Sequence, residues 1–194
     1  MELKLLSIGA VLLASCIVMI LHEIPKTAVF FSLERRNHLG KQLLKSHQFI
    51  DPVGLIFSLT GFCGFSKSYM LRSKRTKDNI ILGVVGYVTL ILVSIVALLI
   101  CKFGFGSVDN ISNGKLFLFM VVQYSSIISF GMLITNLFPL MTMDMGLIIA
   151  GISREKYFSI IRNDYFIKMI FILCALLGII RTFCVNEFLF LYQL

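Results

Sequence analysis

Three ionisable side chains stand at the ends of long apolar runs, where they could carry out chemistry that the surrounding residues cannot. His22 and Glu23 follow the apolar run of residues 3–21, and Asp144 follows the run of residues 116–140. Ionisable groups at membrane depth face a cavity or a partner and mark sites of proton transfer, ion passage or ligand binding. These three residues are therefore the first candidates for a functional site.

Each of the three also has a plainer explanation when it is taken alone. His22 and Glu23 could be boundary residues whose side chains reach the lipid headgroups. Asp144 could pair with Arg154 or Lys156, which follow it by only ten and twelve positions. The combination of the three, and the motifs around them, favour the functional reading.

The composition defines the environment in which these residues lie. Of the 194 residues, 58% are hydrophobic and only 14% are charged, and the mean hydropathy is +0.92. Soluble domains are nearer ~45–50% apolar and ~25% charged. The net charge of +8 is concentrated in short stretches between apolar runs, as in loops that lie against anionic lipid headgroups. A lipid bilayer is therefore an expected partner, and nucleic acid is not.

Four apolar runs are candidates for bilayer crossings, at about 20 residues each. They are residues 3–21, 79–101, 116–140 and 166–180. The fold expected is an all-α polytopic membrane protein with about four transmembrane helices. Residues 1–152 form its membrane core, and residues 153–194 supply a basic loop, a transmembrane helix and a short interfacial tail (residues 183–194).

A fifth apolar stretch, residues 49–65, is expected to enter the membrane without crossing it. Asp51-Pro52 stands near its start, and an aspartate is costly in lipid. The basic loops on its two sides, residues 26–48 and 67–78, both favour the cytoplasmic face. A re-entrant or hairpin element satisfies both loops, and a third basic loop, residues 153–168, is placed on the same face.

A break is expected between the third apolar run and Asp144. Pro139 lacks a backbone donor and interrupts the helix. Irregular backbone at membrane depth is found where it lines a cavity or is buried in protein. The charge bias places Asp144 and His22 at a similar depth.

In this order the residues resemble the site-2 protease family of intramembrane zinc metalloproteases. His22-Glu23-Ile24-Pro25-Lys26 stands where that family has H-E-x-x-H, and residues 136–146 (N-L-F-P followed by M-D-M-G) resemble its N-L-[LF]-P…L-D-G-G. Three weaker landmarks lie between them in family order: residues 49–54 (F-I-D-P-V-G, against H-I-D-P-[IV]-G), 64–67 (G-F-S-K, against G-[WF]-A-K) and 85–90 (V-G-Y-V-T-L, against A-G-P-x-x-N). The resemblance extends to about Gly151 and implies a site-2-protease-like core.

The resemblance implies an incomplete zinc site. Carried over residue by residue, it makes His22 and Asp144 the metal ligands and Glu23 the catalytic base, the latter only in an active enzyme. Lys26 replaces the second histidine, and its ammonium group has no lone pair for a metal. Catalytic zinc needs three protein ligands and an open position, so zinc is expected as a cofactor only in an active enzyme, with a third ligand from His38, His47 or a partner chain.

The surroundings of the motif depart from the family pattern as well. Pro25 is expected to disturb the helical turn that aligns the ligands. Tyr87, Leu90 and Phe49 replace a proline, an asparagine and a histidine of the family landmarks. The remaining landmark residues are assigned to a cavity for a substrate or partner: Asp51, Pro52, Gly54, Asn136 and Pro139.

Three functions compete on this basis. The first is a pseudoprotease, a metalloendopeptidase fold that binds a transmembrane substrate or partner protein without cleaving it. The second is an active zinc-dependent intramembrane metalloprotease with an atypical third ligand. The third is a structural or transport subunit of a membrane complex that uses Asp51, Asp144 and His22 as a polar path.

Overall fold

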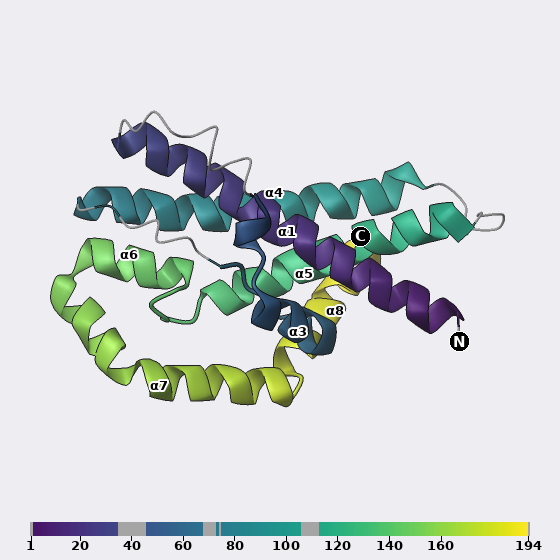
Figure 1. The fold of residues 1–194 in the computed structure, drawn as a ribbon. Coiled ribbons are helices and arrows are strands. Elements are labelled where there is room, and N and C mark those ends of the chain that lie inside the picture. Colours follow the sequence, from purple (N-terminus) through teal and green to yellow (C-terminus); the bar gives the residue numbers. More distant parts are fainter. Residues whose placement is uncertain (1, 35–45, 68–72, 74, 106–112, 194) are drawn as a thin grey trace.

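The computed structural model describes residues 2–34, 46–67, 73, 75–105 and 113–193, and every regular element within them is a helix (Figure 1). The elements are α1 (Glu2–Glu34), the 3₁₀ helix η1 (Ser46–Phe49), α3 (Pro52–Gly61), α4 (Thr76–Gly104), α5 (Asn113–Asn136), α6 (Asp144–Ile152), α7 (Arg154–Leu176) and α8 (Ile179–Gln193). Among them α1, α4 and α5 are long and apolar enough to cross a membrane, and α7 with α8 makes a fourth candidate, bent by 56°. The chain is an all-α, multi-pass membrane protein.

Helix α1 buries a face two residues wide, and one row of this face leads to the ionisable residues. Ala10, Ala14, Val18, His22 and Lys26 follow one another at intervals of four residues, and each is at most 1% exposed. Residues four apart lie on one face of a helix. The alanines allow neighbouring helices to approach closely, so the first half of the row packs tightly and its second half carries the ionisable residues into the interior.

The prediction that α1 ends before a basic loop starting at Lys26 is wrong. The helix continues through Pro25 to Glu34, so Lys26 lies inside it and is buried. A proline removes one backbone hydrogen bond, and membrane helices tolerate this where neighbouring helices pack around the site. Phe30 and Phe31, one turn further, pack against Leu82 and Leu147 and hold the end of the helix in place.

The segment after η1 forms the hairpin that was predicted for residues 49–65. Helix α3 has ten residues, about half the length needed to cross a bilayer. The side chain of Asp51 accepts hydrogen bonds from the backbone of Val53 (2.8 Å) and Gly54 (3.2 Å), which caps the helix. The backbone N–H of Lys67 donates to the carbonyl of Phe49 at 3.0 Å. The hairpin therefore begins and ends at one point.

The predicted break beside Pro139 is confirmed. Helix α5 ends at Asn136, and α6 begins at Asp144. The residues between them form turns, with Met143 N donating to Leu140 O at 3.1 Å. Asp144 therefore occupies the first turn of a new helix that lies beside α4 (Figure 1).

The C-terminal part differs from the prediction in two ways. Residues 153–168, expected as a basic loop, form the first half of α7, because Ser153 caps the helix by accepting a hydrogen bond from the backbone of Lys156 at 3.4 Å. The apolar run 166–180 is interrupted at Gly178, whose φ of 68° is the left-handed conformation that glycine adopts readily. The interfacial tail was predicted for residues 183–194, and residues 183–193 belong to helix α8.

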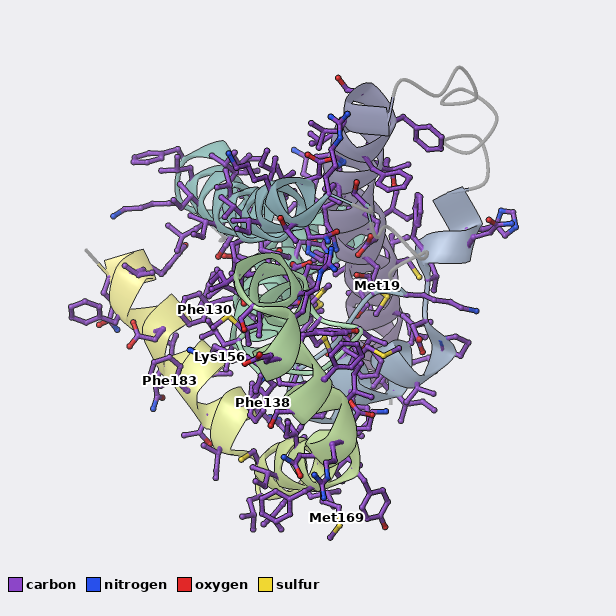
Figure 2. The ribbon with its side chains drawn as sticks, turned by 90° about the vertical axis from the view of Figure 1, so that its left-hand side faces the viewer. Met19, Phe130, Phe138, Lys156, Met169 and Phe183 are labelled. Carbon is purple, nitrogen blue, oxygen red and sulfur yellow. The ribbon has the colours of Figure 1, made fainter. Side chains whose placement is uncertain are left out.

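Helix α8 packs on the outside of α5. The rings of Phe130 on α5 and Phe183 on α8 stack with centroids 6.0 Å apart (Figure 2). Cys184 and Phe188 are buried in a cluster with Cys63 of the hairpin. One face of the hairpin thus packs against α1 and the C-terminal helices, while the apolar side chains on its other face stay exposed. Met169 on α7 points away from the protein (Figure 2).

Candidate functional site

The ionisable residues of α1 meet Asp144 in the interior of the protein. His22, Glu23, Lys26 and Asp144 are each no more than 1% exposed. The ring nitrogen Nε2 of His22 lies 2.8 Å from Oδ2 of Asp144. Residues that are 122 positions apart in the sequence therefore form one buried cluster.

Lys26 places its ammonium group between the two carboxylates of this cluster. Its Nζ lies 3.0 Å from Oε1 of Glu23 and 2.7 Å from Oδ1 of Asp144. The first contact is a hydrogen bond within one turn of α1, and the second is an ion pair that joins α1 to α6. A buried charge is tolerated when it is paired in this way.

Ser66, at the end of the hairpin, completes the cluster. Its hydroxyl donates to Oε1 of Glu23 at 2.6 Å, and its oxygen lies 2.8 Å from Nδ1 of His22. A hydroxyl has one proton to donate, so the contact with His22 requires a proton on Nδ1. The contact of Nε2 with Oδ2 of Asp144 needs one further proton between the two atoms, which the ring or the carboxyl group can carry.

The cluster therefore pairs two nitrogen-bearing side chains with two carboxyl groups. Both His22 and Lys26 lie within 3.1 Å of both Glu23 and Asp144. With a proton on Nδ1 and with Nε2 engaged by Asp144, His22 presents no free lone pair to a metal ion. One acceptor stays open, because Oε2 of Glu23 has no hydrogen-bond partner within the described ranges.

Three residues of α4 and α5 hold Asp144 in position. A Cβ atom at Gly86 would lie 2.2 Å from Oδ2 of Asp144, so only glycine permits this approach of α4. The backbone N–H of Asp144 donates to Oδ1 of Asn136 at 3.3 Å. The hydroxyl of Tyr87 donates to the carbonyl of Asn136 at 2.6 Å, which fixes the end of α5.

The structure brings together His22, Glu23 and Asp144, the predicted ligands and base, and adds Lys26 as their direct partner. The alternative that Asp144 pairs with Arg154 or Lys156 is wrong, because both side chains are exposed and Asp144 contacts Lys26 and His22 instead.

Of the two substitute histidines, the structure describes one, and it does not belong to the cluster. His47 lies in η1 with an exposed side chain, and His38 lies outside the described residues. Within the part of the chain that the structure describes, no group of three or more histidine, cysteine, aspartate or glutamate side chains is arranged to hold a metal ion.

The residues assigned to a partner cavity have local roles in the structure. Asp51 and Pro52 begin α3, and a Cβ at Gly54 would lie 2.0 Å from the carbonyl oxygen of Phe65, so glycine lets the two arms of the hairpin touch. Asn136 supports Asp144. Pro139 lies in the turn between α5 and α6.

Sequence reasoning missed Ser66, Gly86 and the role of Tyr87. Ser66 had a usable signal, because it places a hydroxyl where the G-[WF]-A-K landmark has an alanine. Gly86 stands where the resemblance has the glycine of A-G-P, and its role depends on a contact with α6 that no local pattern reveals.

Comparison of the chain with models of protein families, with curated proteins and with solved structures found no match.

Proposed function

We propose that this protein is a non-catalytic membrane scaffold with a site-2-protease-like core, in which the ammonium group of Lys26 takes the place of the catalytic metal ion. Such a core would bind a transmembrane segment of a partner protein without cleaving it. The proposal rests on one observation above all, the position of Lys26 Nζ between Glu23 and Asp144, at 3.0 and 2.7 Å.

The geometry of the other two residues supports the same proposal. Zinc binds histidine nitrogen and carboxylate oxygen at about 2.0–2.2 Å, which in a tetrahedral site separates the two ligand atoms by roughly 3.4 Å. His22 Nε2 and Asp144 Oδ2 are 2.8 Å apart, the distance of a direct hydrogen bond. A doubly charged ion beside Lys26 would also be repelled by it. The residues present therefore do not fit zinc.

The cluster also has a structural role in the fold. A structural metal ion links the elements that supply its ligands, and here a set of ion pairs and hydrogen bonds links α1, the end of the hairpin and α6. These connections would hold the core in the arrangement that receives a membrane partner. The partner itself is inferred from the resemblance, because members of that family accept transmembrane substrates.

Metal content provides the first test. We expect the detergent-purified protein and its Lys26→Met variant to contain no stoichiometric zinc. Lys26→His restores H-E-x-x-H and should bind about one zinc ion per chain, and the double variant Lys26→His/Asp144→Asn should lose it. Elemental analysis of all four proteins measures this. A folded Lys26→His variant without zinc would argue against the site-2-protease-like core.

Cleavage assays distinguish the scaffold from the active protease. With zinc supplied, the wild-type protein is expected to leave a panel of transmembrane peptides intact. Peptide cleavage that disappears in Glu23→Gln, together with zinc in the wild-type protein that disappears in His22→Ala, would instead make the protein an intramembrane metalloprotease.

A further inference from the structure

A second polar feature lies away from the buried cluster, at the start of α4. It is a hollow of about 440 Å³ lined by Arg75, Thr76, Lys77, Asp78 and Arg154. Three of these five residues are cations, and all three are exposed. In Figure 1 the first turn of α4 and the corner between α6 and α7 meet at the left-hand end of the protein.

Hydrogen bonds around Ser73 fix the α4 side of the hollow. The backbone N–H of Ser73 donates to Oδ1 of Asn79 at 2.9 Å, and Nδ2 of Asn79 returns a bond to the Ser73 carbonyl at 3.1 Å. The Ser73 hydroxyl accepts from the backbone of Arg75 at 3.2 Å. These bonds join Ser73 to Arg75 and to the first turns of α4.

The carboxylate in the hollow is already engaged. Asp78 is 7% exposed, and its Oδ2 accepts from the Ser73 hydroxyl at 2.9 Å. In the described part of the chain, Arg75, Lys77 and Arg154 form no ion pair. The hollow thus presents an excess of positive charge toward its opening.

Gly151 brings the third cation to this place. A Cβ atom at residue 151 would lie 2.4 Å from Cγ1 of Ile80 and 2.6 Å from the carbonyl oxygen of Thr76. Glycine therefore allows the end of α6 to touch the first turn of α4, and Arg154 follows three residues later at the start of α7. Two segments far apart in sequence form this cationic surface through one close contact.

The position of the hollow along α4 indicates which anion it meets. The membrane-spanning candidate α4 begins at Thr76, and its apolar stretch starts at Ile80, after three polar residues. The hollow therefore lies where an apolar span ends, at the level of the lipid headgroups. Arginine binds phosphate through two parallel hydrogen bonds, and basic residues at this level are attracted to anionic lipids.

We propose that this hollow is a binding site for the phosphate-bearing headgroup of an anionic phospholipid. Arg75, Lys77 and Arg154 surround the phosphate, and the acyl chains lie along the exposed apolar side chains of α4, among them Ile81 and Val84. The site depends on neither the buried cluster nor a transmembrane partner, so it goes beyond the function proposed above.

Lipid titration of the full-length protein tests the site. The detergent-purified protein is titrated with phosphatidylglycerol, with phosphatidylcholine and with inorganic phosphate alone, and bound molecules are counted by native mass spectrometry. The variants are Arg75→Gln/Arg154→Gln and, separately, Lys77→Gln. The matched control is Lys115→Gln/Arg162→Gln, which also removes two exposed cations but from the start of α5 and from further along α7.

We expect one phosphatidylglycerol to bind preferentially, with a loss of about five-fold in affinity for each lining cation removed. The control variant should bind as the wild-type protein does, and Lys77→Gln provides a second reading should the double variant fold poorly. Equal weakening in the control and in the lining variants would overturn the proposal. So would equal binding of phosphatidylcholine, or inorganic phosphate binding as tightly as the lipid.

Discussion

At the scale of single residues, Lys26 decides what the buried cluster is. It stands at the position where the resemblance expects a second histidine, and its ammonium group contacts both carboxylates. A lysine supplies positive charge without supplying a ligand. Compared with the pattern that the resemblance expects, a lysine at this position supplies no metal ligand but supplies a cation that contacts Glu23 and Asp144.

Removal of that cation should destabilise the fold. Lys26→Met keeps the length and apolar stem of the side chain but leaves Glu23 and Asp144 in the interior without the ammonium group that both contact. Breaking a buried ion pair by removing one partner costs about 3–5 kcal/mol. We expect a loss of this size in the free energy of unfolding, measured by denaturant titration in detergent micelles. Lys156→Met, at an exposed position on α7, is the control and should change stability little; equal losses in both variants would contradict the role given to Lys26.

At the scale of elements, the cluster forms because the end of the hairpin, the end of α5 and the start of α6 lie at one place. The hairpin returns to its start and delivers Ser66. Helix α5 stops at Asn136, and α6 starts with Asp144 in its first turn. Helix α4 supplies the surface against which α6 lies, and Gly86 is the point of closest approach to the carboxylate.

A methyl group at this point should separate α4 from α6. Gly86→Ala places a Cβ 2.2 Å from Oδ2 of Asp144, and overpacking of this kind costs about 1–3 kcal/mol. The loss is expected although alanine favours a helix over glycine by about 1 kcal/mol. The free energy of unfolding in micelles measures it.

The matched control for Gly86→Ala is Gly114→Ala in α5. A Cβ at Gly114 would meet no atom within 4 Å, so this variant should be neutral or slightly stabilised. A neutral or stabilised Gly86→Ala would mean that α4 and α6 do not approach as closely as the structure indicates.

At the scale of the whole molecule, the bilayer replaces water as the solvent for most of the surface. The exposed side chains of α1 and α4 are largely leucine, isoleucine, valine and phenylalanine, which are stable against acyl chains. The interior instead concentrates polar groups, including serines of α5 that bond to the preceding turn of the helix (2.7 Å for Ser125, 2.6 Å for Ser129). Such an arrangement satisfies buried hydroxyls where no water is present.

The course of the chain through the bilayer can be tested by labelling. Single cysteines at positions 47 and 67 flank the hairpin, and a cysteine at position 115 lies at the start of α5. Because the hairpin returns to its start and α4 is long enough to cross, positions 47 and 67 should react with an impermeant maleimide from one side and position 115 from the other. The wild-type protein, whose five native cysteines are partly or fully buried, controls for background. Labelling of positions 47 and 67 from opposite sides would show that the segment between them crosses the bilayer, which would contradict the prediction.

Local patterns predicted much of the architecture. The apolar runs predicted α1, α4 and α5, since about 20 apolar residues form a helix in lipid whatever lies nearby. Pro139 predicted the interruption before Asp144, and the charge on both sides of residues 49–65 predicted the hairpin. The expectation that Pro25 disturbs the helix is wrong, because a proline removes only one hydrogen bond and the packing around α1 offsets that loss. Residues 153–168 were expected to form a loop because they are rich in charge. A charged segment can also form the first part of a long helix, as it does in α7.

The sequence by itself determined that this is a helical membrane protein and which residues in it are ionisable at depth. Only the tertiary structure decided that Lys26 lies in the interior and contacts both Glu23 and Asp144. It also decided that Ser66 completes the cluster and that Arg154 lines the same hollow as Arg75 and Lys77. The physical reason is that helix formation in lipid depends on local composition, whereas the pairing of charges depends on which helices touch. That choice is made by close contacts at glycines such as Gly86 and Gly151, whose partners lie far away in the chain.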